Sequence, residues 1–274
     1  EQTLKARNRE MESELGLARA LQQTYLPRTY PHLALKTAEG SRELAFAHYY
    51  RPSFTLGGDF LAVQALSETR AYVLMCDVMG HGVRAALVTA MLRALTGELR
   101  GKADSPADFL GALNHLLHES LGGGSQLIFV TAFYGLIDLQ ENTLHYCNAG
   151  SNCAVVVQAD GGLEKLDCAG QCDPALGLFP DLSFQVFAVP FGPGEELICF
   201  TDGVIEASAS DGEEFGENRL YDCLLETRHL PSETRFSELM QRLHTFAGTE
   251  TFDDDICLLS ARVQAPAPAK ADMH

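Results

Sequence analysis

Four aspartates stand beside apolar, strand-like stretches of the sequence. Asp59 follows two glycines and precedes such a stretch, Asp77 and Asp202 end one each, and Asp254 precedes the last. An Asp beside glycine is common at turns and caps, so any one of them has a plain structural explanation. Carboxylates that share one place need cations or protons, because like charges repel. We therefore expect the four to meet around divalent metal ions, and oxygen ligands without paired Cys or His favour Mg²⁺ or Mn²⁺.

The elements that must position these aspartates can be read from hydrophobic periodicity. Strands are expected at 44–50, 60–66 and 70–78, helices at 83–99 and 105–121, a strand meander over 127–157, strands at 163–166, 184–189 and 196–201, helices at 217–227 and 232–247, and a strand at 256–263. The helix at 83–99 is apolar nearly all round, which is typical of a helix that is buried or lies between two partners. The order lacks regular strand–helix alternation and predicts an α+β fold, with two antiparallel sheets and helices stacked outside them.

The first 26 residues form a separate helical pattern. Leu4, Met11, Leu15, Ala18 and Tyr25 recur at spacings of seven, four and three, and Asn8 and Gln22 fall on the same seam. Such a seam is typical of a coiled coil through which two copies dimerise, or of an amphipathic helix packed on its own domain. Prolines 27 and 31 end the pattern.

Composition excludes several classes of function. The chain has 274 residues and a formal net charge of -17, which argues against nucleic acid or an anionic membrane as the main partner. No apolar run reaches the ~20 residues of a membrane span. The eight cysteines form no CxxC pair and are expected to be reduced thiols of a cytoplasmic protein. A zinc site at Cys168 and Cys172 is the minor alternative. The sequence starts at Glu1, so we expect a fragment whose upstream sensor or receiver domain is missing.

A family resemblance rests on several motifs in order. They are Gly57–Phe60, Asp77–Gly82, Asn148–Gly150, Ala175–Leu178, Pro193–Leu197, Phe200–Ala207, Phe215-Gly216 and Asp254–Ile256. In this order they resemble bacterial SpoIIE/RsbU-type serine phosphatases, which belong to the metal-dependent protein phosphatases (PPM, type 2C). The resemblance covers about residues 42–263. It implies a linker helix in residues 1–41 and a phosphatase domain in 42–263 that is a four-layer α-β-β-α sandwich. The tail at 264–274 is rich in Pro and Ala, so we expect it to be disordered.

The resemblance also implies the site. Asp77 would bridge two Mn²⁺ or Mg²⁺ ions, Asp59 and the backbone carbonyl of Val78 would complete one ion, and Asp202 and Asp254 would hold the other with Asp77. A metal-activated water would then hydrolyse phosphoserine or phosphothreonine. Asp254 is chosen over Asp255 because it stands two residues before the apolar Ile256, as in the family.

Some positions depart from the family pattern. Leu61 and Ala62 follow Gly-Gly-Asp-Phe where many relatives carry an aromatic residue and a second Asp, Ser151 replaces a frequent His, and Cys257 replaces Thr or Ser. None of these changes removes an expected ligand. His81 is either a general acid or an exposed filler of a Gly-flanked loop, and both interpretations stay open.

Three functions are compatible with parts of the sequence. A phosphatase would act on a phosphorylated signalling protein, which the family suggests is a STAS-type anti-sigma antagonist. An inactive phosphatase-like binding module is the alternative, although all the acidic ligands are present. A diguanylate cyclase is disfavoured because Phe60 and Leu61 follow Gly-Gly-Asp where that family has Glu-Phe, and no P-loop is present. We also expect the helix of residues 1–26 to dimerise and to press on residues 83–121, which follow Asp77.

Overall fold

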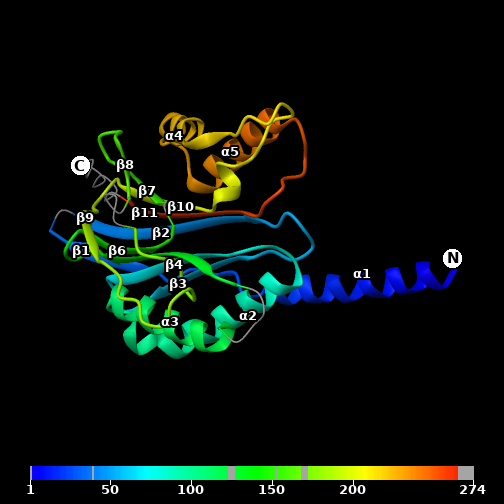
Figure 1. Cartoon of the computed structure of the whole chain (residues 1–274). Helices are drawn as coiled ribbons and strands as arrows, with labels where there is room; N and C mark the ends of the chain where they lie inside the picture. The colour runs from blue at the N-terminus through cyan, green and yellow to red at the C-terminus, as the bar shows by residue number, and fades with distance from the viewer. Residues whose placement is uncertain (1, 39, 123–126, 152–153, 168–171, 265–274) are drawn as a thin grey trace.

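Two antiparallel β-sheets packed face to face form the centre of the chain. The computed structural model describes residues 2–38, 40–122, 127–151, 154–167 and 172–264. Helices cover the outer face of each sheet, so the order of layers is helices, sheet, sheet, helices (Figure 1). This arrangement confirms the predicted α+β sandwich with its preceding helix.

The five-stranded sheet carries the first pair of aspartates. Its strands, in spatial order, are β3 (Asp59–Ala65), β4 (Arg70–Val78), β5 (Val130–Asp138), β6 (Thr143–Ala149) and β9 (Phe187–Pro190). The helices α2 (Val83–Glu98) and α3 (Pro106–Leu121), joined by the 3₁₀ helix η1 (Leu99–Lys102), lie on its outer face. Ser105 caps α3 by accepting a hydrogen bond from the Asp108 amide, as its Ser-Pro start predicts.

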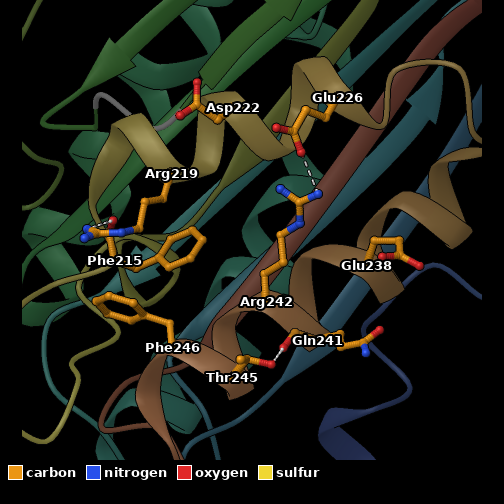
Figure 2. Close-up of a pocket in the computed structure, with 9 residues that line it drawn as sticks. All are labelled: Phe215, Arg219, Asp222, Glu226, Glu238, Gln241, Arg242, Thr245 and Phe246. Carbon is orange, nitrogen blue, oxygen red and sulfur yellow. Dashed lines mark hydrogen bonds and ion pairs between the residues drawn. The ribbon is translucent and has the colours of Figure 1, made fainter.

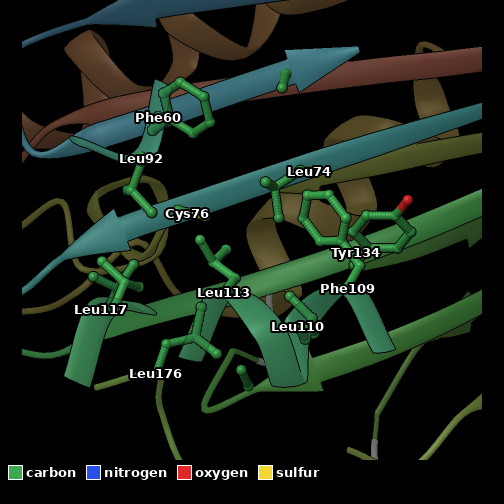
Figure 3. Close-up of a cluster of buried hydrophobic side chains, with 14 of the residues drawn as sticks. Phe60, Leu74, Cys76, Leu92, Phe109, Leu110, Leu113, Leu117, Tyr134 and Leu176 are labelled. Atoms are coloured by element: carbon green, nitrogen blue, oxygen red, sulfur yellow. The ribbon is translucent and has the colours of Figure 1, made fainter. Parts of the chain in front are cut away.

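A continuous apolar core joins this sheet to α2 and α3 (Figure 3). Leu74, Leu92, Phe109 and Leu113 are fully buried there. The interpretation that α2 is buried on all sides is wrong, because its other face leaves Leu87 67% exposed. The sequence could not show this, since apolar side chains on a helix do not reveal which face the domain covers. The alternative, a helix that lies between two partners, stays a prediction.

The six-stranded sheet carries the second pair. Its strands, in spatial order, are β1 (Leu33–Thr37), β2 (Gly40–Arg51), β11 (Ile256–Gln264), β10 (Glu196–Phe200), β7 (Ala154–Val157) and β8 (Leu163–Lys165). The helices α4 (Gly216–Glu226) and α5 (Ser232–Ala247) cover its outer face. A buried ion pair, 2.5 Å between Arg235 Nη1 and Glu196 Oε2, ties α5 to the start of β10.

Several predicted boundaries and pairings need correction. The expected meander over 127–157 is wrong, since β7 leaves the sheet of β5 and β6 and pairs with β10. The free edge of β6 is taken instead by β9, with Tyr146 opposite Phe187. The strand β1 was not predicted. The tail at 265–274 lies outside the described residues, and Gln264 belongs to β11.

The linker helix α1 (Gln2–Gln22) ends four residues earlier than predicted. Its N-terminal half extends away from the body of the domain (Figure 1). Leu4 and Met11 of the predicted seam are exposed, whereas Gln22 on the same seam is buried in the domain. One end of the seam therefore packs on its own domain and the other end faces solvent. Dimerisation through the exposed end stays a prediction.

The described residues include most of the cysteines and the helices named above. Six cysteines lie there, five of them buried and Cys172 exposed, while Cys168 of the alternative zinc pair lies outside them. None of the described helices is long and apolar enough to cross a membrane.

Candidate metal centre

Asp59 and Asp77 lie directly opposite each other on β3 and β4. Backbone bonds at Gly58–Val78 and Leu66–Arg70 place the 59/77 pair at a non-hydrogen-bonded position, where facing side chains approach most closely. Both side chains fall on the same face as Leu61 and Met75, which belong to the core between the two sheets. The strand pairing therefore directs both carboxylates toward the six-stranded sheet.

Asp202 and Asp254 come from the facing sheet. Asp202 opens the 3₁₀ turn η2 (Asp202–Val204) directly after β10, and Asp254 stands two residues before β11. Because β10 and β11 are antiparallel neighbours, the end of one and the start of the other lie at the same edge. The Thr201 amide bonds the Cys257 carbonyl at 3.0 Å there.

A threonine connects the two sheets at this edge. Thr201 Oγ1 donates to Asp59 Oδ2 at 3.0 Å and accepts a hydrogen bond from the Cys257 amide at 2.9 Å. These two bonds give Thr201 a structural role. The bond orients the Asp59 carboxylate, which is 5% exposed.

The carboxylates repel one another. Burial and the charges of Asp202 and Asp254 raise the pKa of Asp77 to about 7. Burial, with Asp77 and then Asp255, raises the pKa of Asp59 well above its usual range. Burial and Asp254 raise the pKa of Asp202, and burial also raises that of Asp254. The four predicted aspartates thus lie close enough to disfavour each other's ionisation.

Asp255 has a different role from Asp254. It is 4% exposed, and its Oδ1 accepts bonds from the Ser53 amide at 2.7 Å and the Ser53 hydroxyl at 2.9 Å. Its Oδ2 accepts the Gly58 amide at 2.5 Å. Asp254 is exposed, and its Oδ1 accepts only the Asp255 amide among the bonds of the described residues. Asp255 therefore holds the Gly57-Gly58 loop, and Asp254 stays available to a ligand.

Two glycines are required by this packing. A side chain at Gly57 would collide with the Tyr50 hydroxyl and the Asp255 carboxylate, and one at Gly203 would collide with the Asp255 backbone. The Val78 backbone oxygen, the fifth predicted ligand, lies beside Gly58, where a Cβ would come within 3.0 Å of it. Glycine thus lets three backbone segments approach one another around the acidic edge.

The donor set fits a hard divalent cation. The side-chain candidates offer oxygen only, and their mutual repulsion is the kind that Mg²⁺ or Mn²⁺ relieves. Within the described ranges, no group of three or more His, Cys, Asp or Glu side chains is arranged to enclose an ion directly. Mg²⁺ usually keeps several waters and takes only one or two carboxylates, so such an enclosure is not required.

A small cavity opens beside Asp77 and Asp202. It has a volume of about 210 Å³ and is also lined by the hydroxyl residues Thr131, Ser151 and Thr201. A wider cavity of about 600 Å³ lies between α4 and α5, and the aromatic rings of Phe215 and Phe246 are part of its lining (Figure 2). None of the predicted ligands lines that second cavity, whereas Asp77 and Asp202 line the smaller one.

His81 lies at the exposed rim of the site. Its ring stacks on Phe54 with centroids 4.3 Å apart, and its charge acts to lower the pKa of Asp254. The loop position is thus fixed by a ring contact, although the choice between general acid and filler remains a prediction.

Several residues of the site could not be predicted from the sequence. Ser53 and Thr131 carry no motif, and the contact of Gln22 with the site has no signal in the sequence. The Gln22 amide group bonds both the Gly57 carbonyl, at 2.7 Å, and the Gly57 amide, at 3.1 Å. Its place on the seam of residues 1–26 indicated that Gln22 faces a partner or the domain, but it did not indicate which residue Gln22 contacts.

Comparison with known proteins identifies the family. The profile of the family described as Stage II sporulation protein E (SpoIIE) matches residues 67–264. The chain is 27% identical over 268 residues to Protein IcfG of Synechocystis sp., covering 88% of this chain and 40% of IcfG. It is 31% identical over 198 residues to Phosphoserine phosphatase RsbP of Bacillus subtilis, covering 72% of this chain and 46% of RsbP.

The fold agrees with solved structures. The SiaA-PP2C domain of Pseudomonas aeruginosa superimposes with a TM-score of 0.78 at 23% identity, covering 94% of this chain and 98% of that domain. The fold is therefore that of a PP2C-type phosphatase domain. The chain belongs to the SpoIIE family of serine phosphatases, and it spans less than half the length of IcfG or RsbP.

The adjacent aspartates give a matched pair of variants. We expect Asp255→Ala to lower the free energy of unfolding by ~1–3 kcal/mol, because the buried Gly58 amide and the part-buried amide and hydroxyl of Ser53 lose their acceptor. Asp254→Ala should leave the metal-free stability unchanged or slightly higher, and should reduce the stabilisation by added Mn²⁺. Denaturant unfolding with and without Mn²⁺ measures both. The opposite pattern would make Asp255 the ligand.

A variant of Asp77 tests the repulsion between the carboxylates of the site. A carboxyl whose folded pKa lies above its unfolded value costs the folded state stability as pH rises toward that folded pKa, here about 7. At pH 8 without metal, we therefore expect Asp77→Asn to melt a few degrees higher than the wild type, and to lose most of the rise in Tm on adding Mn²⁺. Asp222→Asn on α4 removes the same charge as a control. Equal melting of wild type and Asp77→Asn would contradict the repulsion.

Proposed function

We propose that this chain is a Mn²⁺- or Mg²⁺-dependent protein serine/threonine phosphatase. The observation that carries the proposal is the set of mutually repelling aspartates, Asp59, Asp77, Asp202 and Asp254, at one edge of a PP2C-type fold. Membership of the SpoIIE family and similarity to a protein named a phosphoserine phosphatase support it. The substrate proposed is phosphoserine or phosphothreonine on a signalling protein, with a STAS-type regulator suggested by the family.

The proposed ligands divide between the two sheets. Asp77 would bridge two ions, with Asp59 and the Val78 carbonyl on one side and Asp202 and Asp254 on the other. Bound ions of this kind activate water and neutralise phosphoryl oxygens. They would also reverse the local field of a chain whose net charge is -17, which would otherwise repel a phosphate.

The residues of the chain supply orientation and access. Thr201 holds the Asp59 carboxylate in place, and Asp255 holds the Gly58 amide, so the two sides of the site keep a fixed spacing. The cavity of about 210 Å³ gives a phosphoryl group room beside Asp77. The hydroxyls of Thr131 and Ser151 line it and are donors suited to phosphoryl oxygens.

Phosphate release from a phosphoserine protein tests the activity. We expect release to require Mn²⁺ or Mg²⁺, and to fall about 100-fold or more in Asp77→Asn and Asp202→Asn, because charge that stabilises the transition state is lost. Asp222→Asn should retain wild-type activity. Metal-independent release, or full activity of both site variants, would overturn the two-metal proposal. A folded chain that binds Mn²⁺ but releases no phosphate would favour the alternative, a phosphatase-like binding module.

We also propose that the chain forms a homodimer through residues 1–26. The exposed Leu4 and Met11 of α1 support this, since apolar side chains at seam positions lack cover on the described chain. Because Gln22 bonds Gly57 and also Thr89 Oγ1 of α2, at 3.0 Å, the same helix could act on the loop before Asp59.

Sedimentation equilibrium tests the dimer. The wild type should sediment at twice the chain mass of 29.8 kDa, and the double variant Leu4→Glu, Met11→Glu should be monomeric. Leu127→Glu, which changes an exposed leucine elsewhere, should remain dimeric. A monomeric wild type, or a dimer that survives the double variant, would disprove this interface.

A further inference from the structure

The outer edge of β3 is an open edge of the five-stranded sheet. Backbone bonds from Val78 N to Gly58 O, at 3.3 Å, and from Leu66 N to Arg70 O, at 2.8 Å, fix which residues face β4. In an antiparallel pair, residues whose backbone groups bond the neighbouring strand alternate with residues whose backbone groups point away from it. The amide and carbonyl groups of Leu61, Val63 and Ala65 therefore point away from β4. Leu61 is fully buried there, so the accessible part of the open edge is at Val63 and Ala65.

The neighbouring linker does not close this edge. Residues 24–31 run alongside β3, yet no backbone bond joins the two in the part of the chain that the structure describes. Pro27 and Pro31 have no amide hydrogen, so the linker cannot serve as a regular strand partner. Leu26 and Tyr30 instead pack into the core between the sheets.

A groove lies along the open edge as a result. A cavity of about 290 Å³ is bounded by Phe60–Gln64 on one side and by Thr24–Thr29 on the other. A second cavity of about 410 Å³ continues from Val63 to Leu66 and reaches Pro31. The two share Val63 and Gln64, so they lie next to each other along the strand, and we refer to them together as the groove. Val63 is half-buried and Ala65 is exposed, which leaves their backbone groups within reach of a partner.

The groove is positively charged in an acidic protein. Arg28 and Arg93 line the first cavity and Arg100 lines the second, and all three are exposed. None of the three forms an ion pair among the described residues. Asp104, the only carboxylate lining these two cavities, pairs with Arg70 at 2.9 Å.

We propose that this groove is a docking site for an extended, acidic segment of a partner protein, which adds a strand to β3. Unpaired backbone groups would supply the hydrogen bonds, and the three arginines would select carboxylates on the incoming strand. A second copy of this chain fits less well, because its β3 would bring a second set of the same arginines. The docking site does not depend on phosphatase activity.

A synthetic peptide tests the proposal. The probe is a dye-labelled, acetylated peptide in which valine and threonine alternate with glutamate, and its lysine counterpart is the charge control. Fluorescence anisotropy on the full chain should show binding of the glutamate peptide, about tenfold tighter than the lysine peptide, as expected for a few exposed ion pairs. Amide exchange should show the Val63 amide exchanging faster than those of Ala62 and Gln64, and becoming protected when the peptide is added.

Two variants separate strand pairing from general attraction. Val63→Pro removes an outward amide without removing a bond to β4, so the chain should stay folded and lose the peptide. Arg100→Glu should weaken binding, whereas Lys102→Glu, an equal charge change outside the groove, should have a much smaller effect.

Three results would overturn the proposal. They are no binding of the glutamate peptide, equal binding of the two peptides, and unchanged binding to Val63→Pro. Protection of the Val63 amide that rises with protein concentration and without peptide would also overturn it, by showing that a second copy occupies the edge.

Discussion

Repulsion among carboxylates at one edge of the β-sandwich is the constraint on which the rest of the structure depends. Strand pairing places Asp59 against Asp77, and the two facing sheets bring Asp202 and Asp254 to the same edge. Each carboxyl has a raised pKa, and for each the largest cause is burial, with the neighbouring charges adding to it. A fold optimised for stability alone would not keep such a cluster, so we interpret it as a site that a cation completes.

The surrounding structure holds this unfavourable arrangement in place. The Asp255 carboxylate accepts hydrogen bonds from Ser53 and Gly58, and Thr201 connects β10 to Asp59. Glycine at position 57 leaves room for the Asp255 carboxylate. Gln22 extends the same arrangement to the linker helix by bonding Gly57. Gly57, which precedes Gly58 and Asp59, is therefore in direct contact with the helix through which we propose that the chain dimerises.

Local signals in the sequence predicted much of this. Asp77 at the end of an apolar run, and the Ser105-Pro106 start of α3, depend on neighbours in the chain, so strand ends and caps could be read correctly. Pairing between distant segments could not be read in this way. The strand β7 crosses to the other sheet, and the edge of β6 is taken by β9, which lies about 40 residues further along the chain than β6. The distinct roles of Asp254 and Asp255 depend on Ser53, about 200 residues away in sequence.

The most direct test of the central claim is calorimetric titration of the metal-free chain with Mn²⁺ near pH 7, repeated in two buffers of different ionisation enthalpy. The account predicts two ions bound per chain, together with release of protons, because Asp77 has a pKa of about 7 and is partly protonated before metal binds. Asp77→Asn should bind more weakly and release fewer protons. Absence of Mn²⁺ binding, or binding that Asp77→Asn leaves unchanged, would contradict the account.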